Sequence, residues 1–292
     1  MSITDDEIAT QPRLWREVLS GLEQARDLLA APGERILVIG CGTSAFVAES
    51  LAFLREEAGH GVTDAGYASE PRVWRDWDRV VAITRSGTTT EVIAALRDVP
   101  AGVRRIVVTG VVDSPVAEFA DDIIDLSAAD EQSVVQTRFP TTFLTLARAA
   151  LGYDVERSIS LVEEALALPL PVDLSGLDHF VYLGTGWTHG LAQEAALKIR
   201  ESAQAWSESY PLLDYRHGPL AVAHPGSLVW IFGADDASLV DDIRRTGATV
   251  LVGGPEPLVE LVQAQRLAVE IAAQRGLDPD QPRHLTRSII LG

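Results

Sequence analysis

The chain has 292 residues, of which 47% are hydrophobic and 23% charged, and it carries a formal net charge of −18 with a pI of about 4.6. This composition is typical of a globular protein, and the length favours two domains of about 150 residues each. The acidic balance argues against nucleic acid and anionic membrane surfaces as partners, but a local electropositive cradle can still bind a small anion.

The small numbers of cysteine, lysine and histidine residues limit the reactions that the chain can carry out. Cys41 is the single cysteine, which excludes an internal disulfide and favours a cytoplasmic protein. The N-terminus has no secretory signal pattern, and no apolar run is as long as a membrane span. Lys198 is the single lysine, so any imine with a side-chain amine must form there. The six histidines lack metal-ligand spacing, and we expect no metal or other cofactor.

The beginning of the chain predicts a helix, a strand and a glycine turn. Apolar residues recur at helical spacing from Pro12 onward, so we expect residues 1–33 to form an N-terminal helix. The apolar run 34–40 predicts a buried strand, which residues 40–44 (Gly-Cys-Gly-Thr-Ser) link to a second helix. Free backbone N–H groups and the helix dipole make such a turn an anion site. Ala45 replaces the third glycine of the dinucleotide fingerprint, which disfavours a nicotinamide cofactor.

A second turn, rich in hydroxyl groups, follows the strong strand predicted at 78–84. Its Thr84, Ser86 and Thr89 side chains stand before another predicted helix at 91–99. Hydroxyls and amides without a lysine suit a phosphate monoester, although serine and threonine also simply cap helices. Two such turns in one sheet favour a ligand site over capping alone.

Strands alternate with helices along the chain, which predicts an α/β fold of doubly wound parallel sheets. Residues 179–199 can be laid on residues 35–53 at an offset of 144, so that both Gly-x-Gly turns coincide. This self-similarity predicts two tandem flavodoxin-like domains. We expect the first domain at 34–168 and the second at 169–292, ending in an extended tail that crosses the surface.

The segment 197–220 carries the candidate acid–base groups. A predicted helix places Lys198 and Glu201 on one face, and a loop with His217 follows. A carboxylate, an ammonium and an imidazole provide general acid–base catalysis when they converge. These residues also have a purely structural interpretation. Lys198 and Glu201 can form an ion pair between neighbours on a helix, and His217 can simply pack beside the Gly-Pro pair that follows it.

In their order along the chain, these motifs resemble the double sugar-isomerase (SIS) domain family. Its members include the isomerase half of glucosamine-6-phosphate synthase, stand-alone ketose/aldose isomerases and fructosamine-phosphate deglycases. The resemblance covers residues 34–291 and keeps the synthase's 16-residue step from Glu201 to His217. The matching motifs are Cys41-Gly42-Thr43-Ser44, Thr84 to Thr89, Glu131-x-x-Val134-x-x-Thr137, Ala196-Leu197-Lys198-x-x-Glu201, His217-Gly218-Pro219 and Asp278-Pro279-Asp280-x-Pro282-Arg283.

The resemblance implies a role for each matching residue. Glu201 would move a proton between C1 and C2 of a sugar phosphate, with Lys198 as a polar partner near the substrate. His217 would open the sugar ring and would be lent by a neighbouring subunit, which implies a homodimer at least. The sugar phosphate would be bound by Gly42, Thr43, Ser44, Thr84, Arg85, Ser86, Gly87 and Thr89, with Val134 and Arg287 beside them.

The chain departs from the synthase pattern at positions that bear on the reaction. Arg287 stands where the synthase has the lysine that forms an imine with the ketose, and a guanidinium stays protonated and cannot do this. Arg85 replaces a glutamine and adds a bidentate phosphate donor. Thr88 replaces a glutamate and Gln136 a serine, so the expected pocket is related to that of the synthase without being the same.

Three functions stay open at this point. The first is aldose–ketose isomerisation of a sugar phosphate, amino sugars included. The second is a deaminase or deglycase that releases an amine from an aminated sugar phosphate, since the same enolisation precedes C–N cleavage. The third is a non-catalytic sugar-phosphate sensor, which would keep the phosphate turns but would not need Glu201. The retained pair of Glu201 and His217 favours an enzyme.

Overall fold

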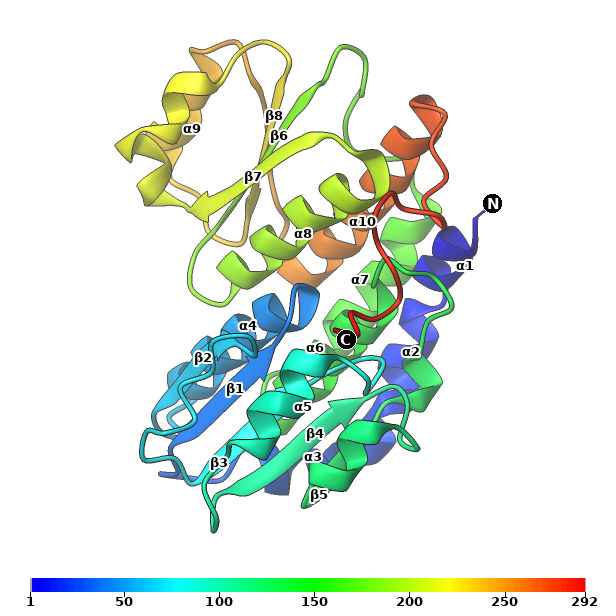
Figure 1. The fold of residues 1–292 in the computed structure, drawn as a ribbon. Helices are drawn as coiled ribbons and strands as arrows, with labels where there is room; N and C mark the ends of the chain where they lie inside the picture. The colour runs from blue at the N-terminus through cyan, green and yellow to red at the C-terminus, as the bar shows by residue number, and fades with distance from the viewer. Residues whose placement is uncertain (1, 292) are drawn as a thin grey trace.

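The computed structural model describes residues 2–291; Met1 and Gly292, the outer ends of the expected N-terminal and C-terminal segments, lie outside the described residues. The chain forms two parallel sheets, each with helices packed against it (Figure 1). The first sheet has the strand order β2-β1-β3-β4-β5 and the second the order β7-β6-β8-β9. The expected α/β class with two doubly wound parallel sheets is confirmed.

The first sheet is built on short apolar strands. Its central strands β1 (Ile36–Gly40) and β3 (Arg79–Ile83) are buried along their whole length. Such strands need no polar–apolar alternation, because helices cover both faces of a parallel sheet. The other strands are β2 (Thr63–Tyr67), β4 (Arg104–Thr109) and β5 (Asp122–Asp125), the helices of this half are α4 (Thr43–Glu57), α5 (Thr90–Arg97), α6 (Arg138–Ala150) and α7 (Glu156–Ala167), and 3-10 turns occur at Pro115–Phe119 and Ser127–Ala129.

The second sheet repeats the strand order of the first. β6 (His179–Gly184) lies between β7 (Trp206–Pro211) and β8 (Ser227–Phe232), as β1 lies between β2 and β3. β7 occurs where only a loop was expected, because serines alternate with larger side chains there and leave no apolar run. The remaining elements are β9 (Thr249–Val252), α8 (Thr188–Ala203), α9 (Ala237–Arg244), α10 (Pro257–Gln274) and 3-10 turns at Leu213–His217 and Pro219–Val222.

The N-terminal segment is helical in pieces, so the expectation of one continuous helix is wrong. Pro12 has no N–H group to continue the first helix, and Gly21 weakens the helix at the second break. The first piece packs on α10, and the later pieces pack on α6, where the indole Nε1 of buried Trp15 donates to Thr141 Oγ1 at 3.2 Å. They are α1 (Ile3–Ala9), α2 (Gln11–Glu17), the 3-10 turn Val18–Gly21 and α3 (Leu22–Leu29).

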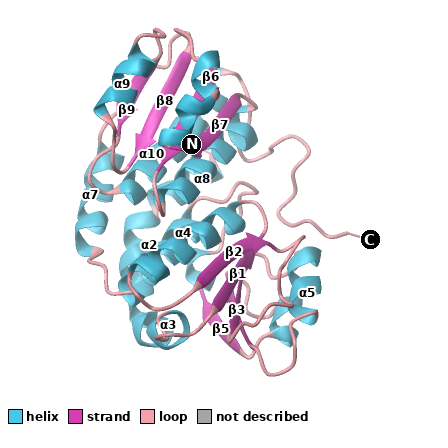
Figure 2. Ribbon diagram, turned by 90° about the vertical axis from the view of Figure 1, so that its left-hand side faces the viewer, coloured by secondary structure: helices cyan, strands magenta, loops and turns pink. Residues whose placement is uncertain are grey.

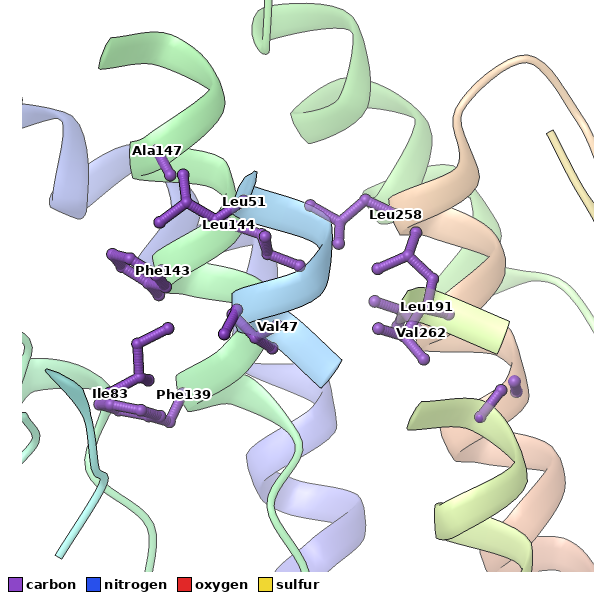
Figure 3. Close-up of a cluster of buried hydrophobic side chains, with 14 of the residues drawn as sticks. Val47, Leu51, Ile83, Phe139, Phe143, Leu144, Ala147, Leu191, Leu258 and Val262 are labelled. Carbon is purple, nitrogen blue, oxygen red and sulfur yellow. The ribbon is translucent and has the colours of Figure 1, made fainter. Parts of the chain in front are cut away.

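One hydrophobic core joins the two halves of the chain (Figure 3). Val47 and Leu51 of α4 lie beside the apolar face of α6 in the first half. The same cluster continues into the second half through Leu191 of α8 and through Leu258 and Val262 of α10. The two sheets therefore share this core, and each sheet also packs against a smaller cluster of its own.

Helices α4 and α8 form the largest helix–helix contact between the halves and run between the two sheets (Figure 2). They approach most tightly at Gly190, where a Cβ would lie 2.3 Å from the carbonyl oxygen of Phe46 and 2.3 Å from Ser50 Oγ. Glycine is required at this position, because any side chain would push the helices apart. The contact brings the N-terminal end of α4 towards the middle of α8.

The chain beyond α10 forms no helix or strand in the described residues and crosses to the first half, as expected for an extended tail (Figure 1). Asp280 in this tail accepts hydrogen bonds from the N–H groups of Ile3 at 2.7 Å and Thr4 at 2.9 Å, at the start of α1. Within residues 2–291, no helix combines the length and the apolar character needed to cross a membrane.

We expect Leu51→Ala to lower the free energy of unfolding by about 2–5 kcal/mol, the usual cost of truncating a buried leucine. Leu51 is 1% exposed in the shared core, so urea unfolding followed by circular dichroism should remain a single transition at a lower midpoint. Leu168→Ala is the matched control, because Leu168 is 60% exposed. Equal losses in the two variants, or two separate transitions, would contradict a shared core.

Candidate functional site

The turn between β1 and α4 requires its glycines. A Cβ at Gly40 would lie 2.5 Å from the backbone carbon of Ser44. Gly42 has φ +53° and ψ −126°, a conformation that residues with side chains rarely adopt. The tight turn buries Thr43 and Ser44, the first two residues of α4. The backbone thus has the compact form that a Gly-x-Gly sequence predicts.

The turn between β3 and α5 is held by its own hydroxyl groups. Thr84 Oγ1 accepts a hydrogen bond from the N–H of Gly87 at 3.3 Å. Gly87 has φ +65°, and a Cβ there would lie 1.8 Å from Ser114 Oγ, so glycine is required. Thr89 occupies the N-cap position of α5, yet its hydroxyl makes no capping hydrogen bond. Helix capping therefore does not explain why a threonine stands at position 89.

A small cavity lies between the two turns, at the carboxyl ends of β1 and β3. The strand order reverses between these strands, and doubly wound sheets bind their ligands at that point. Gln136 lines the cavity with a buried Oε1 that has no hydrogen-bond partner among residues 2–291, which leaves an acceptor for a polar ligand. The cavity of about 30 Å³ is lined by Cys41, Ser44, Ile83, Thr84, Arg85, Ser86, Thr89, Val92, Gln136 and Arg287.

Arg85 and Arg287 line this cavity, but their guanidinium groups bind protein atoms. Arg85 donates from Nη1 to Ser133 O and from Nη2 to Arg287 O, both at 2.8 Å. Arg287 forms an ion pair with Asp130, with 2.7 Å between Nη2 and Oδ2. Burial lowers the pKa of Arg85, and the nearby carboxylate of Glu131 partly offsets this effect. The two arginines that depart from the synthase pattern are therefore neighbours, and phosphate binding by either remains a prediction.

Glu131 and Val134 shape the loop beside the cavity. Glu131 Oε1 accepts hydrogen bonds from the N–H groups of Thr137 and, at 2.8 Å, of Arg138, at the N-terminus of α6. Burial raises the pKa of Glu131. Val134 places its backbone carbonyl 3.4 Å from Arg85 Nη1. In this structure both residues therefore order the backbone around the cavity.

The second part of the site is a buried charge cluster on α8. Lys198 Nζ lies 3.1 Å from Glu194 Oε1 and 2.6 Å from Glu201 Oε2. The side chains of Lys198 and Glu194 are 1% exposed and that of Glu201 is 19% exposed, so a ligand can reach only Glu201 of the three. Glu194 was not predicted, although its place two helical turns before Glu201 put it on the same face.

Lys198 also links this cluster to the first turn. Its Nζ donates a hydrogen bond to Thr43 Oγ1 at 3.2 Å, between residues 155 positions apart in the sequence. Thr43 directly precedes Ser44, which lines the cavity. The hydrogen bond therefore joins the predicted phosphate turn to the predicted acid–base helix.

The pKa values of Glu194 and Lys198 are both raised in the buried charge cluster. Burial raises the pKa of Glu194 to about 7, although Lys198 acts to lower it. Burial alone would lower the pKa of Lys198, but the carboxylates of Glu194 and Glu201 outweigh burial and raise it. Lys198 is therefore an ammonium at neutral pH and lacks the free electron pair that imine formation needs.

His217 stands apart from the cluster. It is exposed at the end of a 3-10 turn, and its imidazole has no hydrogen-bond or ion-pair partner within residues 2–291. The turn itself is anchored by buried Tyr215 and by Arg216, whose Nε lies 3.0 Å from Asp242 Oδ2. The structure of one chain therefore does not bring His217 into contact with Glu201.

The second Gly-x-Gly turn, between β6 and α8, is filled by protein groups. Thr188 Oγ1 donates to the carbonyl oxygen of Phe232 at 2.9 Å. The guanidinium of Arg148 covers the ring of Trp187 at 5.1 Å from its centroid. These side chains bind and pack within the protein, so the two turns have similar backbones but different surroundings.

The chain is similar in sequence to one protein family and in sequence and fold to several known proteins. Residues 29–151 match the model of the SIS domain family. A glutamine–fructose-6-phosphate aminotransferase (isomerizing) of Aeropyrum pernix is 30% identical over 97% of this chain and 56% of its own length, so the chain spans about half the length of the curated relatives it matches. A solved glucosamine-6-phosphate deaminase of Thermotoga maritima is 28% identical, with a TM-score of 0.85 over 99% of this chain and 100% of that one. A tagatose-6-phosphate ketose/aldose isomerase of Escherichia coli, 20% identical with a TM-score of 0.79 over 100% and 96% of the two chains, shows the same fold.

We expect Glu194→Gln to gain stability relative to the wild type as the pH rises from about 4.5 to about 7. The folded protein raises the pKa of Glu194 from 4.5 to about 7, so between these values the folded state binds more protons than the unfolded state. The wild type therefore loses stability as the pH rises through this window, and a neutral glutamine does not. Urea unfolding across the window measures the difference; Glu164→Gln, on an exposed part of α7, should show no such trend. A pH-independent difference for Glu194→Gln would contradict the raised pKa.

Proposed function

We propose that this chain, which carries an SIS domain at residues 29–151, binds a sugar phosphate and interconverts its aldose and ketose forms through an enediol. The observation that carries the proposal is the 3.2 Å hydrogen bond from Lys198 Nζ to Thr43 Oγ1. It supports a single site in which the accessible carboxylate of Glu201 stands beside the anion cavity. We also infer from the shared strand order that residues 34–168 and 169–292 are two copies of the SIS domain.

The phosphate group is assigned to the cavity between the two turns. Ser44, Ser86 and Thr89 offer hydroxyl groups there, and α4 and α5 both begin beside it. Helix N-termini present free N–H groups and the positive end of the helix dipole to an anion. A chain with a net charge of −18 needs such a local site to attract a phosphate dianion.

Glu201 is the base of the proposed reaction. In the open-chain aldose phosphate its carboxylate removes the proton from C2. The electron pair forms the C1–C2 double bond, the π electrons of the aldehyde move to O1, and O1 takes a proton from water to give the enediol. The carboxylic acid then returns the proton to C1 while the hydroxyl at C2 loses its proton to water and becomes the carbonyl, which leaves the ketose phosphate. The ammonium of Lys198, 2.6 Å away, fixes the carboxylate in place. A positioned base of this kind accelerates proton transfer by about 10²–10⁴-fold.

The residues of the site disfavour a covalent imine between the protein and the sugar. Lys198 is held as an ammonium between two carboxylates. Arg287, which stands where the synthase has its imine-forming lysine, is paired with Asp130. The proposed reaction therefore moves protons and forms no bond between the protein and the sugar.

An amino sugar phosphate is the second candidate substrate. The observation that favours it is the match to the glucosamine-6-phosphate deaminase over the whole length of both chains. With an amino group at C2, the same proton transfer from C2 to C1 gives an imine at C2 of the sugar. Water then adds to this imine, ammonia leaves, and the ketose phosphate remains. Both candidate reactions share Glu201 and the phosphate cavity, so the products distinguish them.

We further propose a homodimer in which His217 of one chain completes the site of the other. His217 is exposed with a free imidazole, and its turn is anchored from behind by Tyr215 and Arg216. An imidazolium group can protonate the ring oxygen as the sugar ring opens. Within residues 2–291 of one chain His217 does not contact Glu201, so we assign ring opening to His217 of the neighbouring chain.

We expect deuterium from D2O to enter C1 or C2 of the substrate, and Glu201→Gln to slow this exchange by about 10²–10⁴-fold, because it removes the base. Proton NMR would follow fructose, tagatose, glucosamine and galactosamine 6-phosphates. A ketose or aldose phosphate alone marks an isomerase, and release of ammonia marks a deaminase. Glu164→Gln should keep the wild-type rate. Saturable binding without exchange for any of these sugars would contradict the enzyme and favour a non-catalytic sugar-phosphate-binding protein.

Mixed dimers test the sharing of the site. Glu201→Gln and His217→Ala should each be inactive alone, whereas a dimer with one chain of each contains one site with both residues intact. Random assembly should therefore restore roughly a quarter of the wild-type rate, since half of the dimers are mixed and each has one intact site. Sedimentation establishes the oligomeric state. No recovery in mixed dimers, or full activity of a monomer, would show that His217 does not act across subunits.

A further inference from the structure

The C-terminal tail forms hydrogen bonds with the turn between β3 and α5. Ser288 Oγ lies 3.1 Å from Ser86 Oγ and 2.8 Å from Thr88 Oγ1. The N–H of Thr90, the first residue of α5, donates to the carbonyl oxygen of Ile289 at 3.2 Å. A hydroxyl and a carbonyl oxygen of the tail therefore stand at a helix N-terminus, where the oxygens of an anion would bind.

The tail narrows the space that is available to a phosphate group. The cavity that remains beside it has a volume of about 30 Å³. A phosphate monoester brings one phosphorus and four oxygen atoms to the same place. Arg287 forms part of the cavity wall and directly precedes the residues that bind the turn, so the end of the tail borders the space that a phosphate would enter.

The tail is attached firmly at its base. Asp280 accepts three hydrogen bonds from the start of α1, from Ile3 N–H at 2.7 Å, Thr4 N–H at 2.9 Å and Thr4 Oγ1 at 2.7 Å. A carboxylate at a helix N-terminus is also favoured by the helix dipole. The base of the tail therefore keeps its place when the end of the tail moves.

The end of the tail, residues 288–291, is attached lightly. Its side chains Ile289, Ile290 and Leu291 are exposed, Ile290 by 71%, so little apolar surface is buried there. Its contacts to the turn are neutral hydrogen bonds, and His284 upstream has φ +66°, a conformation unusual for a residue with a side chain. Segments with few buried apolar contacts open at low free-energy cost.

We propose that residues 288–291 compete with the phosphate group of the substrate for the turn between β3 and α5. The sugar phosphate binds after this end of the tail leaves Ser86, Thr88 and Thr90. A ligand that requires an open state binds with an affinity reduced by the fraction of chains in that state. The tail therefore sets the apparent affinity of the site. This inference rests on the phosphate cavity of the proposed function.

Hydrogen–deuterium exchange of the full wild-type chain, with and without inorganic phosphate, tests the competition directly. The amides of Ser288 to Leu291 should exchange faster when phosphate is present, because the tail is displaced. The amides around Asp280 should not change, since the base stays attached. Slower exchange at Ser288 to Leu291 would mean that the tail closes over the phosphate, and would overturn the proposal.

Ser288→Ala provides an independent measurement by calorimetric titration with inorganic phosphate. Loss of the hydroxyl should tighten phosphate binding by roughly two- to tenfold, the equivalent of one net hydrogen bond. Ser160→Ala is the matched control, because Ser160 is exposed on α7 and bonds only within that helix. Unchanged or weaker binding by Ser288→Ala would contradict the competition alone. Absence of phosphate binding in every variant would contradict the phosphate cavity and, with it, the competition.

Discussion

The contact between α4 and α8 is the constraint on which the site depends. Gly190 lets the two helices approach until Lys198 on one reaches Thr43 on the other. At that contact a buried ammonium is balanced by Glu194 and Glu201, and a buried charge that loses its partner costs about 3–5 kcal/mol. Packing and charge balance thus act at the same place, and they hold the predicted acid–base helix against the predicted phosphate turn.

The two Gly-x-Gly turns have similar backbones but different surroundings. Both follow the first strand of a parallel sheet and lead into a long helix. Beside the first turn lies a polar cavity with an unpaired amide oxygen on Gln136. At the second, Thr188 binds a strand carbonyl and Trp187 packs under Arg148. The surroundings, supplied by other parts of the chain, decide which turn can accept a ligand.

Helix α1 and the C-terminal tail both contact segments that border the cavity. The carboxylate of Glu7 in α1 accepts from the N–H of Gln132 at 2.6 Å, and Ser133 beside it accepts from Arg85. The tail begins at the same helix through Asp280 and continues to the cavity wall. Arg85 and Arg287 connect these segments through backbone carbonyls and an ion pair. The N-terminal helix therefore supports both the loop and the tail that border the cavity.

The sequence by itself determined the α/β class, the buried strands, the two glycine turns and the pairing of Lys198 with Glu201. Continuous apolar runs, glycines and helical spacing are local features, and each specifies its structure over a few residues. Only the tertiary structure decided that β7 is a strand, that Arg85 faces Arg287 and that Glu194 is buried with a raised pKa. These features depend on strand pairing, on burial and on charges brought from distant segments, and no local pattern encodes those contacts.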